Sequence, residues 1–390
     1  MLRLQSNKNI IVSTVEDSGV LILKVSTSSD LPLVLRFNVA LILEKYKGES
    51  LDGFGLVFSK YKDDSNIAGV QYIDERLHYL VDGDVIRVNP RKSLVRAIYR
   101  INGSANFLFV TERCNSFCLM CSQPPRKVDD GYLIEELIRA IPLINKGARE
   151  LGITGGEPTL LGERFFQLVR TIKNYLPSTA VHVLTNGRSF SNSELASQLA
   201  GIGHKDLMLG IPLYSDVSHI HDFVVQADGA FDETIRGILN LKRHSQKVEI
   251  RVVIHKQTYS RLPQLAEFIG RNLQFVDHVA LMGLEITGFT RANLSELWID
   301  PPEYSDQLSR AVKTLKRFGI RTSIYNHQLC LLPESLWRYS VKSISDWKNK
   351  YYEACSDCEM KNDCGGFFSS SDIKRSQNIK AIKTRSPKAS

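Results

Sequence analysis

Hydrophobic and polar positions change their pattern near residue 106 of the chain. From there on, short apolar runs alternate with longer segments whose apolar residues recur at helical spacing and whose outer faces carry charges. The runs predict strands at residues 107–110, 151–154, 181–184, 207–212, 248–254 and 278–282. The segments between them predict helices that include residues 132–144, 163–175, 231–243 and 262–272. Six strand–helix units predict an α/β fold with a parallel sheet, which right-handed crossovers curl into a barrel.

The first hundred residues follow a different pattern, in which short apolar runs are separated by turn signals. The runs are IIVSTV, GVLILKV, FGLVFSKY and YLVDGDVIRV, the last of them around a turn at Asp82-Gly83. A longer apolar segment at residues 31–43 fits either a helix or two strands. We therefore expect a β-rich N-terminal domain at residues 1–100, followed by the barrel at residues 101–320.

The composition is that of a globular protein with an ordinary core. With 390 residues and 43% hydrophobic content, the chain can form two domains or one barrel with extensions. It has no run of eighteen uncharged apolar residues, and its start, MLRLQSNKNI, lacks the apolar core of a secretory signal. The seven cysteines are odd in number and grouped in metal-like spacings, which favours a reducing compartment over disulfides. These features predict a cytoplasmic protein that does not contact a membrane.

Much of the net charge of +8 lies at the C-terminal end of the chain. After Asp372 there is no acidic residue, and the basic ones are Lys374, Arg375, Lys380, Lys383, Arg385 and Lys388. Such a composition is typical of a solvated, disordered tail, here residues 373–390, and it also suits contact with an acidic partner. No nucleic-acid-binding motif accompanies the charge, so a nucleic acid is not the expected partner.

Three cysteines within eight residues, Cys114, Cys118 and Cys121 in TERCNSFCLMCSQPP, form the most informative motif. They follow the first predicted strand, and Pro124-Pro125 behind them cannot continue a helix, so we expect them on a loop. A cubane iron–sulfur cluster takes one thiolate for each of its four irons, so three cysteines leave one iron open to a substrate or cofactor. The alternatives are free cysteines on one buried helix face and a zinc site, which usually needs four ligands.

Two further stretches, ITGGEP at residues 153–158 and VLTNGR at residues 183–188, follow predicted strands. Together with the CxxxCxxC run they resemble the radical S-adenosylmethionine (SAM) superfamily. More narrowly, TERCNSFCLMCSQPP, YNHQLCLLP and the closing CGGFF resemble the radical SAM maturase of the His-Xaa-Ser peptide system, over about residues 100 to 370. The resemblance implies a partial barrel of six strand–helix units, open on one side, with a cysteine-rich extension at residues 321–372.

The resemblance also implies how SAM is held. Gly155, Gly156 and Glu157 would bind the amino group of its methionine part, since paired glycines allow close backbone approach. By themselves these residues would indicate only a turn. Met120 would pack against the adenine, although a methionine is equally a core filler.

Weaker candidates for SAM contacts lie after the later strands. Ser215 and Asp216 are expected to meet the ribose hydroxyls, and Arg251 the carboxylate of SAM. Each of them is otherwise explained as an ordinary solvated loop residue. The Asn186-Gly187 pair indicates first of all a turn.

The four remaining cysteines, Cys330, Cys355, Cys358 and Cys364, have the spacing Cx24Cx2Cx5C. Four thiolates fill one cubane or, as the alternative, one zinc site. The resemblance favours a fully ligated auxiliary [4Fe-4S] cluster. A second auxiliary cluster would need other ligands, and His327, His219 and His221 are the histidines to consider, although a lone histidine is more often simply hydrogen-bonded.

The activity implied by the resemblance is reductive cleavage of SAM to methionine and a 5′-deoxyadenosyl radical, which abstracts hydrogen from an unactivated carbon. We therefore predict a radical SAM peptide maturase, an oxidoreductase that modifies a ribosomally synthesised precursor with His-Xaa-Ser repeats. Its expected partners are that precursor, a second radical SAM maturase and an electron donor such as flavodoxin or ferredoxin. The N-terminal domain is expected to bind a leader peptide by strand addition. The alternatives are a radical SAM enzyme for a small molecule or nucleotide, and a non-catalytic, metal-stabilised binding scaffold.

Overall fold

The computed structural model describes residues 4–9, 19–342 and 350–383. The chain divides into two compact units. Unit 1 consists of Met1–Phe109, Gly131–Gly152 and Gln167–Ala180, and unit 2 of Val110–Asp130, Ile153–Phe166 and Val181–Ser390. The units thus differ from the division expected at residue 100, because unit 1 includes two later segments of the chain. One contact within unit 1 explains part of this, since Arg87 donates to both carboxylate oxygens of Glu136, at 2.6 and 2.9 Å.

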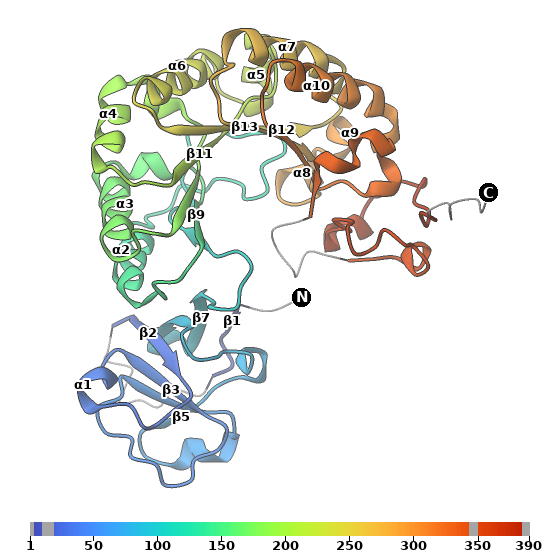
Figure 1. Cartoon of the computed structure of the whole chain (residues 1–390). Helices are drawn as coiled ribbons and strands as arrows, with labels where there is room; N and C mark the ends of the chain where they lie inside the picture. Colours follow the sequence, from blue (N-terminus) through green and yellow to red (C-terminus); the bar gives the residue numbers. More distant parts are fainter. Residues whose placement is uncertain (1–3, 10–18, 343–349, 384–390) are drawn as a thin grey trace, which may run out of the picture. The chain divides into compact units, whose positions relative to one another are not determined.

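Unit 1 is built on a seven-stranded sheet with the strand order β1-β7-β6-β2-β3-β4-β5 (Figure 1). The strands are β1 (Gln5–Ser6), β2 (Leu21–Ser26), β3 (Val39–Leu43), β4 (Leu56–Ser59), β5 (Val70–Tyr72), β6 (Val85–Asn89) and β7 (Leu94–Tyr99). Antiparallel pairs join β1, β7, β6 and β2, whereas β2 to β5 pair in parallel. The region is β-rich, as the alternation of its apolar runs predicts.

The ambiguous segment at residues 31–43 contains one element of each kind. A one-turn helix, α1 (Leu33–Arg36), is followed by β3, whose five residues are all buried. The turn at Asp82-Gly83 is present: Gly83 has a φ of +88°, and the Asp82 carboxylate accepts a hydrogen bond from the Thr27 N–H at 2.6 Å. The run IIVSTV at residues 10–15 lies outside the described residues.

The second sheet has eight strands in the order β15-β14-β13-β12-β11-β10-β9-β8. The strands are β8 (Phe107–Phe109), β9 (Glu150–Thr154), β10 (Ala180–Leu184), β11 (Leu207–Pro212), β12 (Lys247–Ile254), β13 (His278–Gly283), β14 (Thr322–Tyr325) and β15 (Ser340–Val341). From β10 to β15, neighbouring strands pair in parallel. All six predicted strands are present within one residue of their expected ends, and β14 and β15 extend the sheet.

The helices are α2 (Tyr132–Ala140), α3 (Glu163–Tyr175), α4 (Ser193–Ile202), α5 (Ser218–Val225), α6 (Ala230–Arg243), α7 (Leu262–Asn272), α8 (Phe289–Ala292), α9 (Leu294–Leu297) and α10 (Ser305–Arg317). Helices α3 and α7 have the predicted ends, while α2 stops early and continues as a 3-10 turn that contains Pro142, which has no N–H to donate. This alternation with parallel strands is the predicted α/β partial barrel. Within the described ranges, every helix is too short or too polar to cross a membrane.

Strands β10 to β14 present one apolar and one polar face, because alternate residues of a strand point to opposite sides. Leu209, Ile250 and Leu281 belong to the face that is completely or almost completely buried. The opposite face carries Glu249 opposite His278, together with other polar residues. In a parallel barrel, reactive groups gather at the carboxyl ends of the strands, on the loops that follow them.

Candidate functional site

The loop from Thr111 to Asp130 carries the first three cysteines and is closed at its base by Asp130. The Thr111 hydroxyl donates to the two carboxylate oxygens of Asp130 at 3.1 and 3.0 Å, and the Glu112 N–H donates to one of them at 2.5 Å. Arg113 forms an ion pair with the same carboxylate at 3.3 Å. Since Asp130 is only 3% exposed, these charge-assisted bonds hold the two ends of the loop together.

Gly155 and Gly156 lie directly against the start of this loop. The Gly156 N–H donates to the Thr111 carbonyl at 2.7 Å. A Cβ atom on Gly155 would lie 2.5 Å from the Thr111 oxygen, and one on Gly156 would lie 2.1 Å from the Arg113 oxygen. Both positions therefore require glycine for backbone packing. The structure places the two glycines beside the cysteine loop, and their contact with the amino group of SAM stays a prediction.

Glu157 is fully buried, and its carboxylate joins the loops after β9 and β10. Oε1 accepts from the Thr159 N–H and hydroxyl, at 3.0 and 2.6 Å, and from the Thr185 hydroxyl at 2.6 Å. Oε2 accepts from the Asn186 N–H at 2.6 Å. Burial raises the pKa of this carboxyl, and the hydrogen bonds oppose the shift. Four protein donors thus satisfy a carboxylate that is 0% exposed, so Glu157 holds the two loops together, and its contact with the amino group of SAM stays a prediction.

The loop after β10 also contacts the cysteine loop directly. The Asn186 side-chain amide donates to Asn115 Oδ1 at 2.6 Å. The Arg188 guanidinium donates to the Asn115 carbonyl at 2.7 Å and to the Ser116 hydroxyl at 3.1 Å. Glu233 on α6 accepts from Arg188 Nε at 2.6 Å and so fixes the guanidinium. The TNGR stretch, whose Asn186-Gly187 pair indicates first of all a turn, thus also holds the cysteine loop in place.

The far end of the cysteine loop is held by α8. The Phe289 N–H donates to the Cys121 carbonyl at 2.8 Å, and the Thr290 hydroxyl donates to the Met120 carbonyl at 3.1 Å. The Met120 side chain is buried in an apolar cluster that includes Tyr214. Its packing role is therefore observed, while its contact with adenine stays a prediction.

The three thiols of the loop are close enough to affect one another. Burial raises the pKa of Cys114 to about 11 and that of Cys118 to about 12, with smaller contributions from neighbouring thiols, and it also raises the pKa of Cys121. The Cys121 thiol donates to the Gln123 carbonyl at 3.0 Å. In the metal-free protein these groups are neutral thiols, so cluster binding must displace their protons.

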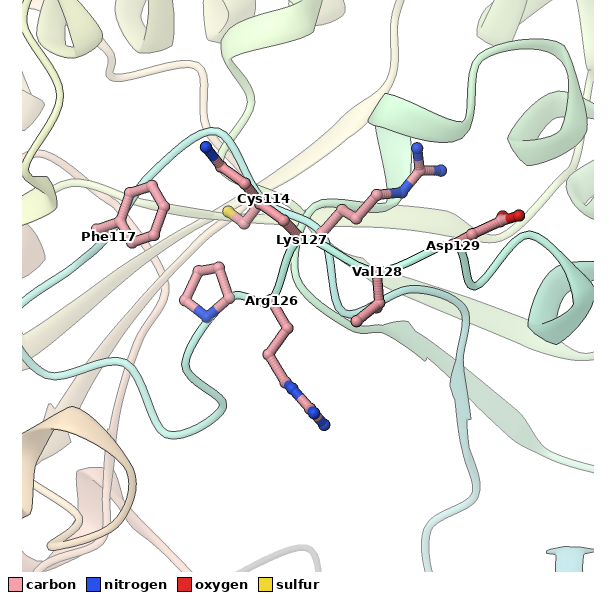
Figure 2. A pocket seen from close by; sticks show the side chains of 8 residues that line it. Cys114, Phe117, Arg126, Lys127, Val128 and Asp129 are labelled. Carbon is pink, nitrogen blue, oxygen red and sulfur yellow. The ribbon is translucent and has the colours of Figure 1, made fainter.

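A pocket of about 540 Å³ opens beside Cys114 (Figure 2). It is lined by Arg113, Cys114, Phe117, Pro125, Arg126, Lys127, Val128 and Asp129. Three of these side chains are basic and one is acidic, and Phe117 is 45% exposed. The surface next to the first cysteine is therefore partly apolar and carries positive charge.

Ser215 and Asp216 follow β11, and both already have protein partners. The Ser215 hydroxyl is buried and accepts from the Val217 N–H at 3.1 Å. The Asp216 carboxylate accepts two hydrogen bonds from the Arg261 guanidinium, at 2.9 and 2.5 Å. Such a bidentate pair occupies the carboxylate. The predicted contacts of Ser215 and Asp216 with the ribose stay predictions.

Arg251 lies on the polar face of β12, in an ion-pair network that the sequence does not reveal. It donates to Glu249 at 2.7 Å, and His278 Nδ1 lies 2.7 Å from the other oxygen of that carboxylate. His182 Nε2 is 3.5 Å from Glu249. Burial opposes ionisation, yet the histidine hydrogen bonds and the charge of Arg251 hold the pKa of Glu249 well below its usual range. Gly210 makes room for the network, because its Cβ would meet His182 and Arg251 at 2.8 and 2.9 Å.

The other four cysteines come together in the C-terminal extension. They are Cys330, Cys355, Cys358 and Cys364. Burial raises the pKa of the Cys330 thiol, and its three partners raise it further, as Cys355 and Cys358 do for Cys364. Backbone hydrogen bonds from Gly366 and Leu329 act on Cys364 in the opposite direction, because they favour the thiolate. The four thiols are close enough to affect one another, and backbone N–H groups favour their thiolate forms. This environment suits a metal centre with four thiolate ligands.

The histidines considered as extra ligands have other roles. His327 Nε2 lies 2.8 Å from the Tyr304 hydroxyl, and its Nδ1 lies 2.8 Å from the Tyr325 carbonyl. His221 Nδ1 accepts from the Tyr214 N–H at 3.2 Å, and His219 is exposed on α5. Among the residues with assigned positions, no three His, Cys, Asp or Glu side chains form a set that holds a single metal ion as it stands. A cluster differs from an ion in that each thiolate binds its own iron.

Comparison with known proteins gives matches over the barrel region. Residues 108–269 match the family model of the Radical SAM superfamily. The GTP 3′,8-cyclase of Mesorhizobium japonicum is 32% identical over 156 residues, which are 38% of this chain and 45% of the relative. The tungsten-containing aldehyde ferredoxin oxidoreductase cofactor-modifying protein of Pyrococcus furiosus is 25% identical over 173 residues, 42% of this chain and 47% of the relative. The chain thus spans about half the length of these curated relatives.

Among solved structures, native anSMEcpe with bound AdoMet matches with a TM-score of 0.43 and 17% identity, over 56% of this chain and 62% of that one. A structural match with so low a TM-score adds nothing to the family match. The similarity to radical SAM proteins therefore depends on the sequence of residues 108–269 and on the motifs within it.

Proposed function

We propose that this chain, in which residues 108–269 form a radical SAM domain, is an enzyme that cleaves SAM and modifies a peptide by hydrogen abstraction. The observation that carries the proposal is the meeting of three motifs that are separate in sequence. The cysteine loop is hydrogen-bonded to the GGEP stretch after β9 and to the TNGR stretch after β10. The cofactors of the superfamily are a [4Fe-4S] cluster and SAM, and when bound they supply hydrogen abstraction from an unactivated carbon.

The residues around the loop suit this cofactor pair. Cys114, Cys118 and Cys121 would hold the cluster through three irons. The loop that Glu157 fixes would bring Gly155 and Gly156 to the amino group of SAM, and the Arg251 guanidinium, steadied by Glu249, suits a carboxylate. The buried apolar cluster around Met120 would exclude water from the side of the cysteine loop against which it packs.

The first experiment tests SAM cleavage. Protein loaded anaerobically with iron and sulfide is given SAM and dithionite, and we expect it to form 5′-deoxyadenosine. Cys114→Ala leaves two local ligands and should reduce this product to background, whereas Cys330→Ala, outside the loop, should not. Retained product in Cys114→Ala would reject the assignment of the loop. A wild-type protein that neither binds nor cleaves SAM would instead support a non-catalytic scaffold.

A peptide substrate is supported by an apolar patch on unit 1, in addition to the motif resemblance to the His-Xaa-Ser maturase. The patch consists of Leu33, Val34, Leu35 and Phe37, which are between 57% and 79% exposed. Contiguous exposed apolar side chains typically mark a site of protein or peptide contact. We therefore assign to the patch the leader of a precursor peptide with His-Xaa-Ser repeats.

The second experiment tests the peptide. The chain is co-expressed with the candidate precursor encoded beside its gene, with and without a second radical SAM maturase, and the precursor is weighed. A mass change that depends on Cys114 would support peptide maturation, and a loss of two hydrogens would indicate a crosslink or unsaturation. The double variant Val34→Asp, Phe37→Ser should weaken modification while sparing SAM cleavage without peptide. Leu239→Ser, an exposed apolar residue on α6, is the matched control and should leave both unchanged.

A small molecule or nucleotide is the second candidate substrate, and the specific observation in its favour is the name of several relatives. The cyclase of M. japonicum, 32% identical over 156 residues, is named for GTP. GTP consumption that requires SAM and Cys114, together with an unmodified precursor, would favour this candidate over the peptide.

A further inference from the structure

Ile382 and Lys383, the last described residues of the basic tail, lie against the second cysteine group. The Ile382 N–H donates to Cys358 Sγ at 3.3 Å, and the Ile382 carbonyl accepts from the Glu359 N–H at 3.0 Å. The Lys383 ammonium donates to the Asp357 carbonyl at 2.7 Å. The residues before, at and after Cys358 are therefore all bonded to the tail.

The start of the tail is fixed by two aromatic rings. The Lys374 ammonium lies 4.7 Å from the centre of the Trp298 ring, and the Arg375 guanidinium lies 4.2 Å from that of Tyr352. The Asn378 amide donates to Asp300 at 3.3 Å. Residues 373–383 therefore make specific contacts, in place of the disordered course expected from composition, whereas residues 384–390 lie outside the described residues.

We propose that residues 376–383 form a strap that covers the auxiliary cluster and raises its reduction potential through the N–H donor of Ile382 to Cys358. The inference rests on the proposed function, because it takes the four cysteines as cluster ligands. Hydrogen bonds to the sulfurs and solvent exposure are among the factors that set the potential of such a centre.

The direction of the effect follows from charge. Reduction adds an electron to a centre that already carries thiolate charge, so N–H dipoles aimed at the sulfurs stabilise the reduced form more than the oxidised form. The Lys383 ammonium, which donates to the carbonyl of Asp357 next to Cys358, acts in the same direction. Removing a donor should therefore make the cluster harder to reduce.

The test removes this donor from the full-length protein. Ile382→Pro deletes the backbone N–H, and Ile382→Ala is the matched control that keeps it. Both are made in a Cys114→Ala background, so that the signal of the loop cluster does not overlap, and the auxiliary centre is titrated potentiometrically by electron paramagnetic resonance. We expect a lower midpoint potential in the proline variant than in the alanine control.

The outcomes separate the strap from the proposed function. Equal potentials in the proline and alanine variants, at equal iron content, would overturn the strap and leave the cluster assignment standing. Loss of iron in the proline variant alone would support the covering role, as would faster loss of the cluster in air after truncation at residue 375. A Cys114→Ala protein that binds one zinc, or lacks about four irons, would instead reject the auxiliary cluster itself.

Discussion

Gly156 has no Cβ atom, and this allows the start of the cysteine loop to pack against the stretch that follows β9. A Cβ there would lie 2.1 Å from the Arg113 oxygen, so Gly156→Ala must displace the start of the loop. We expect this variant to lose about 1–3 kcal/mol of stability, as overpacking does, and to bind clearly less iron after reconstitution. Gly201→Ala is the control, because it lies in α4 with no atom within 4 Å of the new methyl, and alanine should stabilise the helix by about 1 kcal/mol. Equal iron content in the two variants would contradict the packing argument.

Glu249 is the second residue whose loss should have a large effect. Glu249→Ala removes the partner of Arg251 and His278, and breaking a buried ion pair in this way costs about 3–5 kcal/mol. Glu267→Ala breaks two surface pairs, with Arg271 and with Arg317, and each should cost less than about 1 kcal/mol. Chemical denaturation of the two variants measures the difference. If they are equally stable, the network on the polar face contributes little.

Single residues differ in how far the sequence reveals them. The three cysteines of the loop and the GGEP glycines are predictable, because spacing within one loop is a local property. The pairing of Glu249 with His278 is not, because the two residues come from different strands and meet only through the register of the sheet. The same holds for Asp216, whose expected role with the ribose did not include its pair with Arg261.

At the scale of elements, hydrophobic periodicity predicts the helices that pack against the sheet. Helices α3 and α7 have the expected ends, because their apolar positions recur at helical spacing over the whole segment. Composition gives the wrong prediction for residues 373–383, which it indicates to be disordered. They are ordered by contacts with aromatic rings and a carbonyl elsewhere in the chain, and composition does not reveal such contacts. Periodicity could not decide between a helix and two strands at residues 31–43, because one turn of helix is too short to show a helical period.

The cysteine loop as an element also predicts the electron donor that suits the protein. Arg126 and Lys127 are exposed at the pocket beside Cys114, and flavodoxin or ferredoxin is expected to dock there through acidic groups. Arg126→Gln with Lys127→Glu should slow donor-driven SAM cleavage roughly tenfold at low salt. Lys313→Glu, an exposed residue on α10, is the control. The dithionite-driven rate should not change, and if it falls equally the variant has damaged the loop instead.

At the scale of the whole molecule, buried histidines make stability depend on pH. Burial lowers the pKa of His221, His255 and His327 from 6.5 to about 4. Between these values the unfolded chain binds protons that the folded chain does not, so stability falls as pH falls through 6.5. At pH 5.5 each histidine costs about 1.4 kcal/mol, or about 4 kcal/mol for the three. Glu157 acts in the opposite direction, because its raised pKa lets the folded state take up a proton.

The acid effect is measured by urea denaturation at pH 7.5 and 5.5 on iron-free protein, so that acid release of metal does not contribute. His255→Leu isolates one of the three sites, because neither ring nitrogen of His255 has a hydrogen-bond partner within the described residues. Its loss of stability between the two pH values should be smaller than that of the wild type by about 1.4 kcal/mol. An unchanged loss would mean that His255 is protonated in the folded state and that water or local opening reaches it at pH 5.5.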